Sequence, residues 1–146
     1  MTTAVLDANV ILSGLASLDK PTSKPAQILR RWFQGDVTVV LSEHVLGEIR
    51  DALSAKRYFR ERVPELEREP VVANMRELAR LVDLMDIPTG VAPHRHDDPV
   101  LALVAVSKAD YFVTGDAALL ALGSYFGVRF IDPAGLLRTL DADPKP

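Results

Sequence analysis

Thr3-Ala4-Val5-Leu6-Asp7-Ala8-Asn9-Val10 joins one apolar run to a carboxylate and then to a second apolar run that continues to Ala16. The first run predicts a short buried strand, and the second predicts an apolar helix. Asp7 would then lie just beyond the C-terminal end of a strand, where open α/β sheets form their ligand-binding crevice. Burial of a lone carboxylate is costly unless it is paired or bound to a metal, and no lysine or arginine lies near Asp7 in the sequence.

The rest of the chain continues this alternation of strand and helix. Further strands are predicted over 37–41, 84–87, 111–113 and 128–131. Helices are predicted over 25–33, 45–53, 98–106 and 117–122, in an amphipathic segment with Val71, Met75, Leu78 and Val82 on one face, and from Asp132–Pro133 onward. The alternation predicts an α/β fold, a three-layer α/β/α domain with a mostly parallel central sheet of four or five strands. We expect one domain over residues 1–140 and a frayed tail over 141–146.

Composition excludes several classes of protein. The chain has no cysteine, so disulfides, zinc–thiolate sites and thiol catalysis are ruled out. We find no long apolar run and no basic-then-apolar N-terminal segment, and we therefore expect a cytoplasmic protein without membrane association. The net charge is −3, yet five basic residues gather between positions 50 and 62. The local field of such a cluster matters more than the net charge in deciding whether a polyanion can bind.

Three other carboxylates occupy positions similar to that of Asp7. Asp116 follows the predicted strand 111–113, and parallel strands bring their C-terminal ends to one edge, so Asp7 and Asp116 should share that edge. Asp98 stands at a helix start and Glu48 near another, so both can face the same crevice. Each also has a purely structural interpretation: Asp98 and Asp116 can cap helices, and Glu48 can be an ordinary helix-edge residue.

Four carboxylates that converge would repel one another strongly, and a hard divalent cation removes that repulsion. An acidic site without cysteine or a paired histidine motif favours Mg²⁺ or Mn²⁺ over zinc. Such a site suits phosphodiester hydrolysis, because the metal activates water and offsets phosphate charge. His94 and His96 are interpreted as loop residues and His44 as a helix-surface residue.

Four stretches, in this order, resemble motifs of the PIN-domain nucleases, and in particular of the VapC-like toxins of toxin–antitoxin pairs. They are residues 5–10, 42–49, 97–103 and 109–116, and the resemblance extends over nearly the whole chain. The resemblance implies a Mg²⁺- or Mn²⁺-dependent ribonuclease in which Asp7, Glu48, Asp98 and Asp116 bind the metal and carry catalysis. It implies polar support from Asn9, Thr114 and Asp97. It also implies an antitoxin protein that blocks the acidic crevice and, as in many PIN proteins, a homodimer.

A basic and aromatic stretch, Lys56-Arg57-Tyr58-Phe59-Arg60, resembles a segment of the same subgroup. Lys56, Arg57 and Arg60 are predicted to bind the RNA substrate, and Arg95 is a further candidate for a phosphate contact. The sequence leaves two interpretations of the aromatic pair open, because such rings either stack on bases or belong to the core. At His94-Arg95-His96 the chain departs from the subgroup, where more acidic residues are expected.

Three other functions share parts of this pattern. A receiver-type signalling domain also clusters acids at strand ends, but it needs a lysine after a late strand, where this chain has Gly115–Asp116. A haloacid-dehalogenase-type phosphatase needs a second aspartate two residues after the first, where this chain has Asn9. A catalytically inactive PIN-fold binding module would keep the fold and lack turnover.

Overall fold

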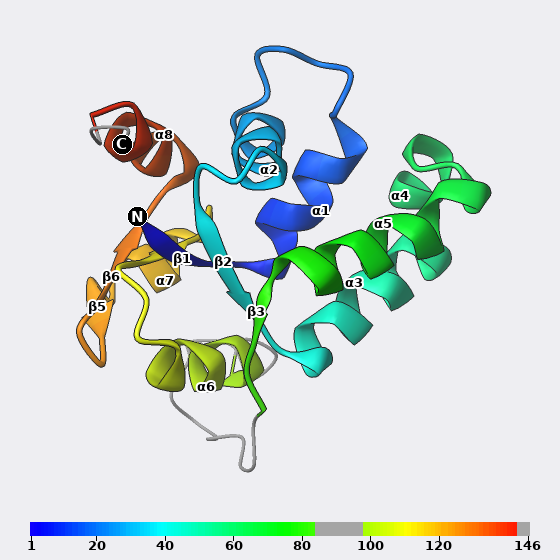
Figure 1. Ribbon diagram of the computed structural model, residues 1–146. Helices are drawn as coiled ribbons and strands as arrows, with labels where there is room; N and C mark the ends of the chain where they lie inside the picture. The colour runs from blue at the N-terminus through cyan, green and yellow to red at the C-terminus, as the bar shows by residue number, and fades with distance from the viewer. Residues whose placement is uncertain (84–97, 143–146) are drawn as a thin grey trace.

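A six-stranded sheet forms the middle of the computed structural model, which describes residues 1–83 and 98–142 (Figure 1). Its strands are β1 (Thr3–Leu6), β2 (Thr38–Leu41), β3 (Arg80–Leu81), β4 (Tyr111–Val113), β5 (Ser124–Tyr125) and β6 (Val128–Ile131). The strand order is β3-β2-β1-β4-β6-β5, and only the β5–β6 pairing is antiparallel among these strands. The mostly parallel sheet is therefore confirmed, with one strand more than expected. Two of the six strands, β3 and β5, were not predicted, because each has only two residues, too few to form a sequence pattern.

Helices cover both faces of this sheet. Those in the described residues are α1 (Ala8–Ala16), α2 (Lys24–Phe33), α3 (Glu43–Ala55), α4 (Arg57–Arg62), α5 (Glu65–Leu78), α6 (Asp98–Ser107), α7 (Ala117–Leu120) and α8 (Pro133–Ala142). Figure 1 shows α1 and α2 on one face of the sheet and α6 on the other, which confirms the three-layer α/β/α fold. α8 extends two residues into the predicted tail. Within the described ranges, no helix combines the length and apolar character needed to span a bilayer.

The central strand β1 positions the site. Ala4, Val5 and Leu6 are fully buried, because β1 pairs with β2 on one side and with β4 on the other. A parallel strand covered on both faces reads as a continuous apolar run, which is the pattern seen here. Leu6 stands opposite Val113 in the β1–β4 register, so the residues that follow the two strands are neighbours.

The amphipathic helix predicted through Val71, Met75, Leu78 and Val82 is wrong at its C-terminal end. α5 ends at Leu78, and the chain then pairs with β2 as β3, so Val82 is not part of the helix. The backbone N–H of Val82 instead donates to the carbonyl oxygen of Leu41 at 2.9 Å. Val72 and Met75 are the buried residues of α5, whereas Leu78 is 45% exposed. The segment after Leu78 pairs with the edge of the sheet at β2, so it does not continue the helix that the apolar spacing predicted. The predicted strand 84–87 lies outside the described residues.

The N-terminal end of the helix α3 is fixed by polar contacts. Ser42 caps its start as predicted, because its hydroxyl accepts a hydrogen bond from the N–H of Val45 at 3.2 Å. Two guanidinium nitrogens of Arg76 donate to the carboxylate of Glu43, at 2.9 and 3.0 Å, and this bond joins α5 to α3. The hydrogen bonds from Arg76 lower the pKa of Glu43 below its usual value. α3 is therefore held firmly at the end that precedes Glu48.

Gly14 permits the close approach of α1 and α2. A Cβ atom at this position would lie 2.7 Å from Leu29 Cδ1 and 2.9 Å from the carbonyl oxygen of Pro25. We expect Gly14→Ala to lower the free energy of unfolding by about 1–3 kcal/mol, because the added methyl group overpacks the helix interface. Urea denaturation measures this change. The matched control is Gly47→Ala in α3, where no described atom lies within 4 Å of the new Cβ. It should gain about 0.5–1 kcal/mol from helix propensity, and equal effects of the two substitutions would contradict the expectation.

Candidate active site

A cleft of about 410 Å³ lies beside the C-terminal end of β1, between the start of α1 and one face of α3. It is lined by Asp7, Ala8, Asn9, Leu12, Val45, Glu48, Asp51, Ala52, Ala55, Lys56 and Val100. Four residues that the sequence singled out separately, Asp7, Asn9, Glu48 and Lys56, thus share one cavity. Its carboxylates come from Asp7 after β1 and from Glu48 and Asp51 on α3, and Lys56 is the C-cap residue of α3.

Asp7 occupies the N-cap position of α1, yet its side chain makes no capping hydrogen bond to that helix. Its carboxylate is directed instead at β4: the hydroxyl of Thr114 donates to Asp7 Oδ2 at 2.8 Å. Asp7 is only 7% exposed, and Thr114 is fully buried. A carboxylate in so buried a place needs such a partner, because desolvation of an unpaired charge is costly. Asp7 is therefore held in a fixed orientation at the mouth of the cleft.

The same hydroxyl connects Asp7 to Asp116. Thr114 Oγ1 accepts a hydrogen bond from the backbone N–H of Asp116 at 3.1 Å, while the N–H of Asp7 donates to the carbonyl oxygen of Val113 at 2.9 Å. Asp116 Oδ1 accepts from the N–H groups of Ala118 and Leu119, so the capping interpretation of Asp116 is confirmed. Asp116 does not line the cleft, but one residue links it to Asp7.

Glu48 faces the cleft from α3, and its side chain is 43% exposed. His44, one turn earlier, places Nε2 2.8 Å from Glu48 Oε1, so this exposed histidine has a partner that the sequence analysis did not foresee. Asp51, three residues after Glu48, also lines the cleft and was missed as a site residue. Its i,i+3 spacing from Glu48 was the available signal, because residues so spaced share a helix face.

Asp98 is 3% exposed and is the first residue of α6, where the predicted helix 98–106 also begins. It does not line the cleft, although Val100 in the same helical turn does. Asp97, Arg95, His94 and His96 lie outside the described residues.

The predicted substrate-binding residues Arg57 and Arg60 stand on α4, immediately after the Lys56 end of the cleft. Arg57 Nε donates to Glu61 Oε1 at 2.7 Å, and both side chains are more than half exposed. Neither Arg57 nor Arg60 lines the cleft itself.

The oxygen donors of the cleft fit a hard divalent cation that takes only a few of its ligands from the protein. Within residues 1–83 and 98–142, no group of three or more histidine, aspartate or glutamate side chains is arranged to hold a metal ion. Mg²⁺, however, is commonly bound by one or two carboxylates, with waters and substrate phosphates as its other ligands. Asp7, at the start of α1, and Glu48, on α3, both line the cleft and can supply that donor set. The described residues therefore fit a two-carboxylate site better than a four-carboxylate cage.

The comparison with protein families agrees with this architecture. A family model described as a PIN domain matches residues 3–118, a span that includes β1, α3, α6 and β4 with the carboxylates they carry. No curated protein and no solved structure matches the chain. Because the family model covers most of the sequence and the fold is the expected α/β/α sandwich, the chain belongs to the PIN-domain family of nucleases.

Proposed function

We propose that this protein is a Mg²⁺- or Mn²⁺-dependent endoribonuclease that hydrolyses phosphodiester bonds of RNA. The observation that carries the proposal is the cleft that Asp7, fixed by Thr114, and Glu48 line together beside the C-terminal end of the central strand. PIN domains are generally nucleases that use divalent metal ions, and membership of that family supports the reaction class.

In this proposal the side chains of the cleft divide the work. Asp7 and Glu48 supply oxygen ligands, and the bound metal would lower the pKa of a water and offset charge on the phosphate. Glu48 is half exposed, so it is also suited to accept a proton from the attacking water. Asn9 and Asp51 orient that water by hydrogen bonds, and Lys56 pairs with a neighbouring phosphate.

Asp98 and Asp116 complete the proposed acidic set from outside the cleft lining. Asp116 acts through Thr114, whose hydroxyl it holds with its backbone N–H. Asp98 contributes its carboxylate from the buried first turn of α6. Val100, in the same turn, lines the cleft.

Replacement of Asp7 by asparagine tests the reaction. Asp7→Asn keeps the side-chain shape and removes the charge, so cleavage of a mixed fluorogenic RNA panel in Mg²⁺ or Mn²⁺ should fall by about 100-fold or more. EDTA should abolish cleavage by the unaltered chain. Asp141→Asn, at an exposed residue near the end of α8, is the matched control and should keep full activity.

Cleavage that persists in EDTA, or that Asp7→Asn leaves unchanged, would contradict the metal-dependent mechanism. A folded chain that binds Mn²⁺ in calorimetric titration but cuts no RNA or DNA of the panel would favour the inactive binding module instead.

Thr114→Val removes the hydroxyl that orients Asp7 and preserves the side-chain volume. We expect a loss of about 1–3 kcal/mol in the free energy of unfolding, because a buried hydrogen bond to a carboxylate is lost. Cleavage should also fall by about 10- to 100-fold, as when the partner of a metal ligand is removed. Thr114→Ser retains the hydroxyl and should retain most of the activity. If valine left kcat unchanged in a folded enzyme, Thr114 would have no positioning role.

We further propose that the nuclease is the toxin of a toxin–antitoxin pair, because its motifs resemble those of VapC-like toxins. The partner antitoxin would place a basic side chain in the acidic cleft, opposite Asp7 and Glu48. Co-expression with the small protein encoded by the neighbouring gene should yield a complex that co-purifies and cuts RNA much more slowly than the free chain. Full cleavage activity in that co-expressed preparation would exclude the toxin role. A homodimer and a cytoplasmic location belong to the same proposal, and light scattering of the purified chain decides the first of them.

A further inference from the structure

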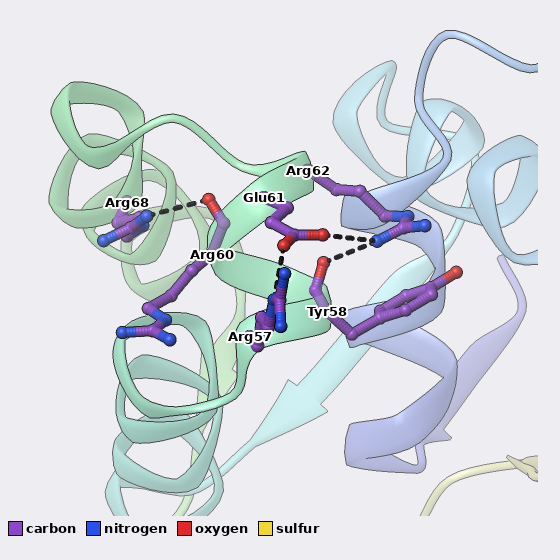
Figure 2. Close-up of polar contacts among 6 residues, drawn as sticks. All are labelled: Arg57, Tyr58, Arg60, Glu61, Arg62 and Arg68. Atoms are coloured by element: carbon purple, nitrogen blue, oxygen red, sulfur yellow. Dashed lines mark hydrogen bonds and ion pairs between the residues drawn. The ribbon is translucent and has the colours of Figure 1, made fainter.

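The short helix α4 displays an exposed aromatic ring among arginines where the cleft ends. Figure 2 shows Tyr58 on the side of α4 that faces α1, with the guanidinium of Arg62 over its ring, while Arg60 extends toward the other side of the helix. α4 begins directly after Lys56, which itself lines the acidic cleft. Tyr58 therefore follows the Lys56 end of the cleft by two residues.

The two aromatic residues of α4 have different roles in the structure. Phe59 is partly buried and packs against the hydrophobic core, whereas Tyr58 is 53% exposed and is not part of that core. The edge of one ring meets the face of the other, with ring centroids 5.2 Å apart and planes at 87°. Phe59 therefore anchors Tyr58, and burial in the core does not explain why a tyrosine stands at position 58.

Arg62 is held over this exposed ring. Its Cζ lies 3.7 Å from the centroid of the Tyr58 ring, and its Nη1 donates to the carbonyl oxygen of Tyr58 at 3.0 Å. Glu61 Oε2 lies 3.9 Å from the same nitrogen (Figure 2). Tyrosine rings and guanidinium planes are both surfaces on which unpaired nucleobases stack. Because the pair is already ordered, little conformational entropy remains to be lost when a base binds.

The charges around the pair favour a base over a phosphate as its ligand. A second cavity, of about 690 Å³, borders Arg62 and is lined by three acids, Asp19, Glu61 and Glu67, against two bases, Lys20 and Arg62. A phosphate there would meet a net negative lining, whereas a neutral nucleobase would not. On the cleft side, Lys56 is positioned for the phosphate backbone. A strand that crosses α4 would therefore place its backbone near Lys56 and a base on the ring.

We propose that Tyr58 and Arg62 form a stacking platform for one unpaired base of the RNA strand that the cleft holds, and that the platform makes single-stranded RNA the preferred substrate. The inference rests on the proposed ribonuclease function. Glu48 and Lys56 are eight residues apart on α3, or about 12 Å at 1.5 Å per residue. At the stacked rise of about 3.4 Å per nucleotide, the stretch from Glu48 to Lys56 corresponds to about four nucleotides. A base paired within a duplex cannot leave its partner to reach the ring without an unstacking cost.

Binding of RNA by the full chain tests the platform. Fluorescence anisotropy is measured with a labelled ten-nucleotide single strand and with the same strand annealed to its complement, in Mg²⁺ and on the Asp7→Asn background so that the strand stays intact. Tyr58→Ala should weaken binding of the single strand by about tenfold, the effect of losing one stacked base, and Tyr58→Phe should stay within about twofold of the parent. Arg62→Lys keeps the charge but loses the guanidinium plane, so it should also weaken binding several-fold. Binding of the duplex should change by less than about twofold.

Phe126→Ala is the matched control, since Phe126 is an exposed aromatic residue at the turn between β5 and β6, away from α4 (Figure 1). An abasic nucleotide at the stacked position should weaken binding by the parent and cause no further loss in Tyr58→Ala. Equal affinities of parent and Tyr58→Ala, equal losses on single strand and duplex, or no binding of the single strand by the parent would each overturn the platform. If cleavage depends on Asp7 but RNA binding does not depend on Tyr58, only the platform is overturned. If binding depends on Tyr58 but the unaltered chain never cuts RNA, the platform is supported and the nuclease proposal is overturned.

Discussion

A carboxylate that is 93% shielded from water must be held by hydrogen bonds, and the arrangement around Asp7 meets that demand. The partner that the structure provides is the buried hydroxyl of Thr114, which arrives from the neighbouring strand β4. For the bond to form, β1 and β4 must pair in parallel with Leu6 opposite Val113. The position of β1 in the middle of the sheet, the burial of its side chains and the turn into α1 all contribute to this one contact.

The two walls of the cleft differ in rigidity, because Asp7 is buried whereas the acids of α3 are exposed. Asp7 belongs to the end of a fully buried strand, and its side chain has a buried partner. Glu48 and Asp51 project from α3, with exposed side chains that water can reach. α3 itself is well anchored, by the Ser42 cap and by the paired hydrogen bonds between Arg76 and Glu43. A fixed acid thus faces acids that can adjust on a rigid helix, which suits a site that must accept a charged ligand and release it.

Much of this arrangement could be predicted because local rules governed it. The apolar run before Asp7, the β-branched run before Ser42 and the strand before Thr114 each identified their elements correctly. The helix prediction failed at Val82. The apolar spacing of this segment suited a helix, but its backbone hydrogen-bonds to the edge of the sheet instead. Asp51 escaped notice because its only local signal was the i,i+3 spacing from Glu48, which acids on a charged helix often show without sharing a site. The division between Tyr58 and Phe59 was likewise undecidable from sequence, since adjacent aromatics on a short helix become distinct only when the core is in place.

The bond between Thr114 and Asp7 joins positions that are 107 residues apart in the chain. A ribosome that has made the first hundred residues has produced Asp7, Glu48 and Asp98, but not the strand that orients Asp7 or completes the pairing of β1. Contacts of such long range form late, because the chain between them must first be synthesised and then closed into a loop. Prematurely terminated copies of this protein would therefore lack an ordered acidic cleft. The topology therefore delays the ordering of Asp7 until the segment that carries β4 and Thr114 has been synthesised.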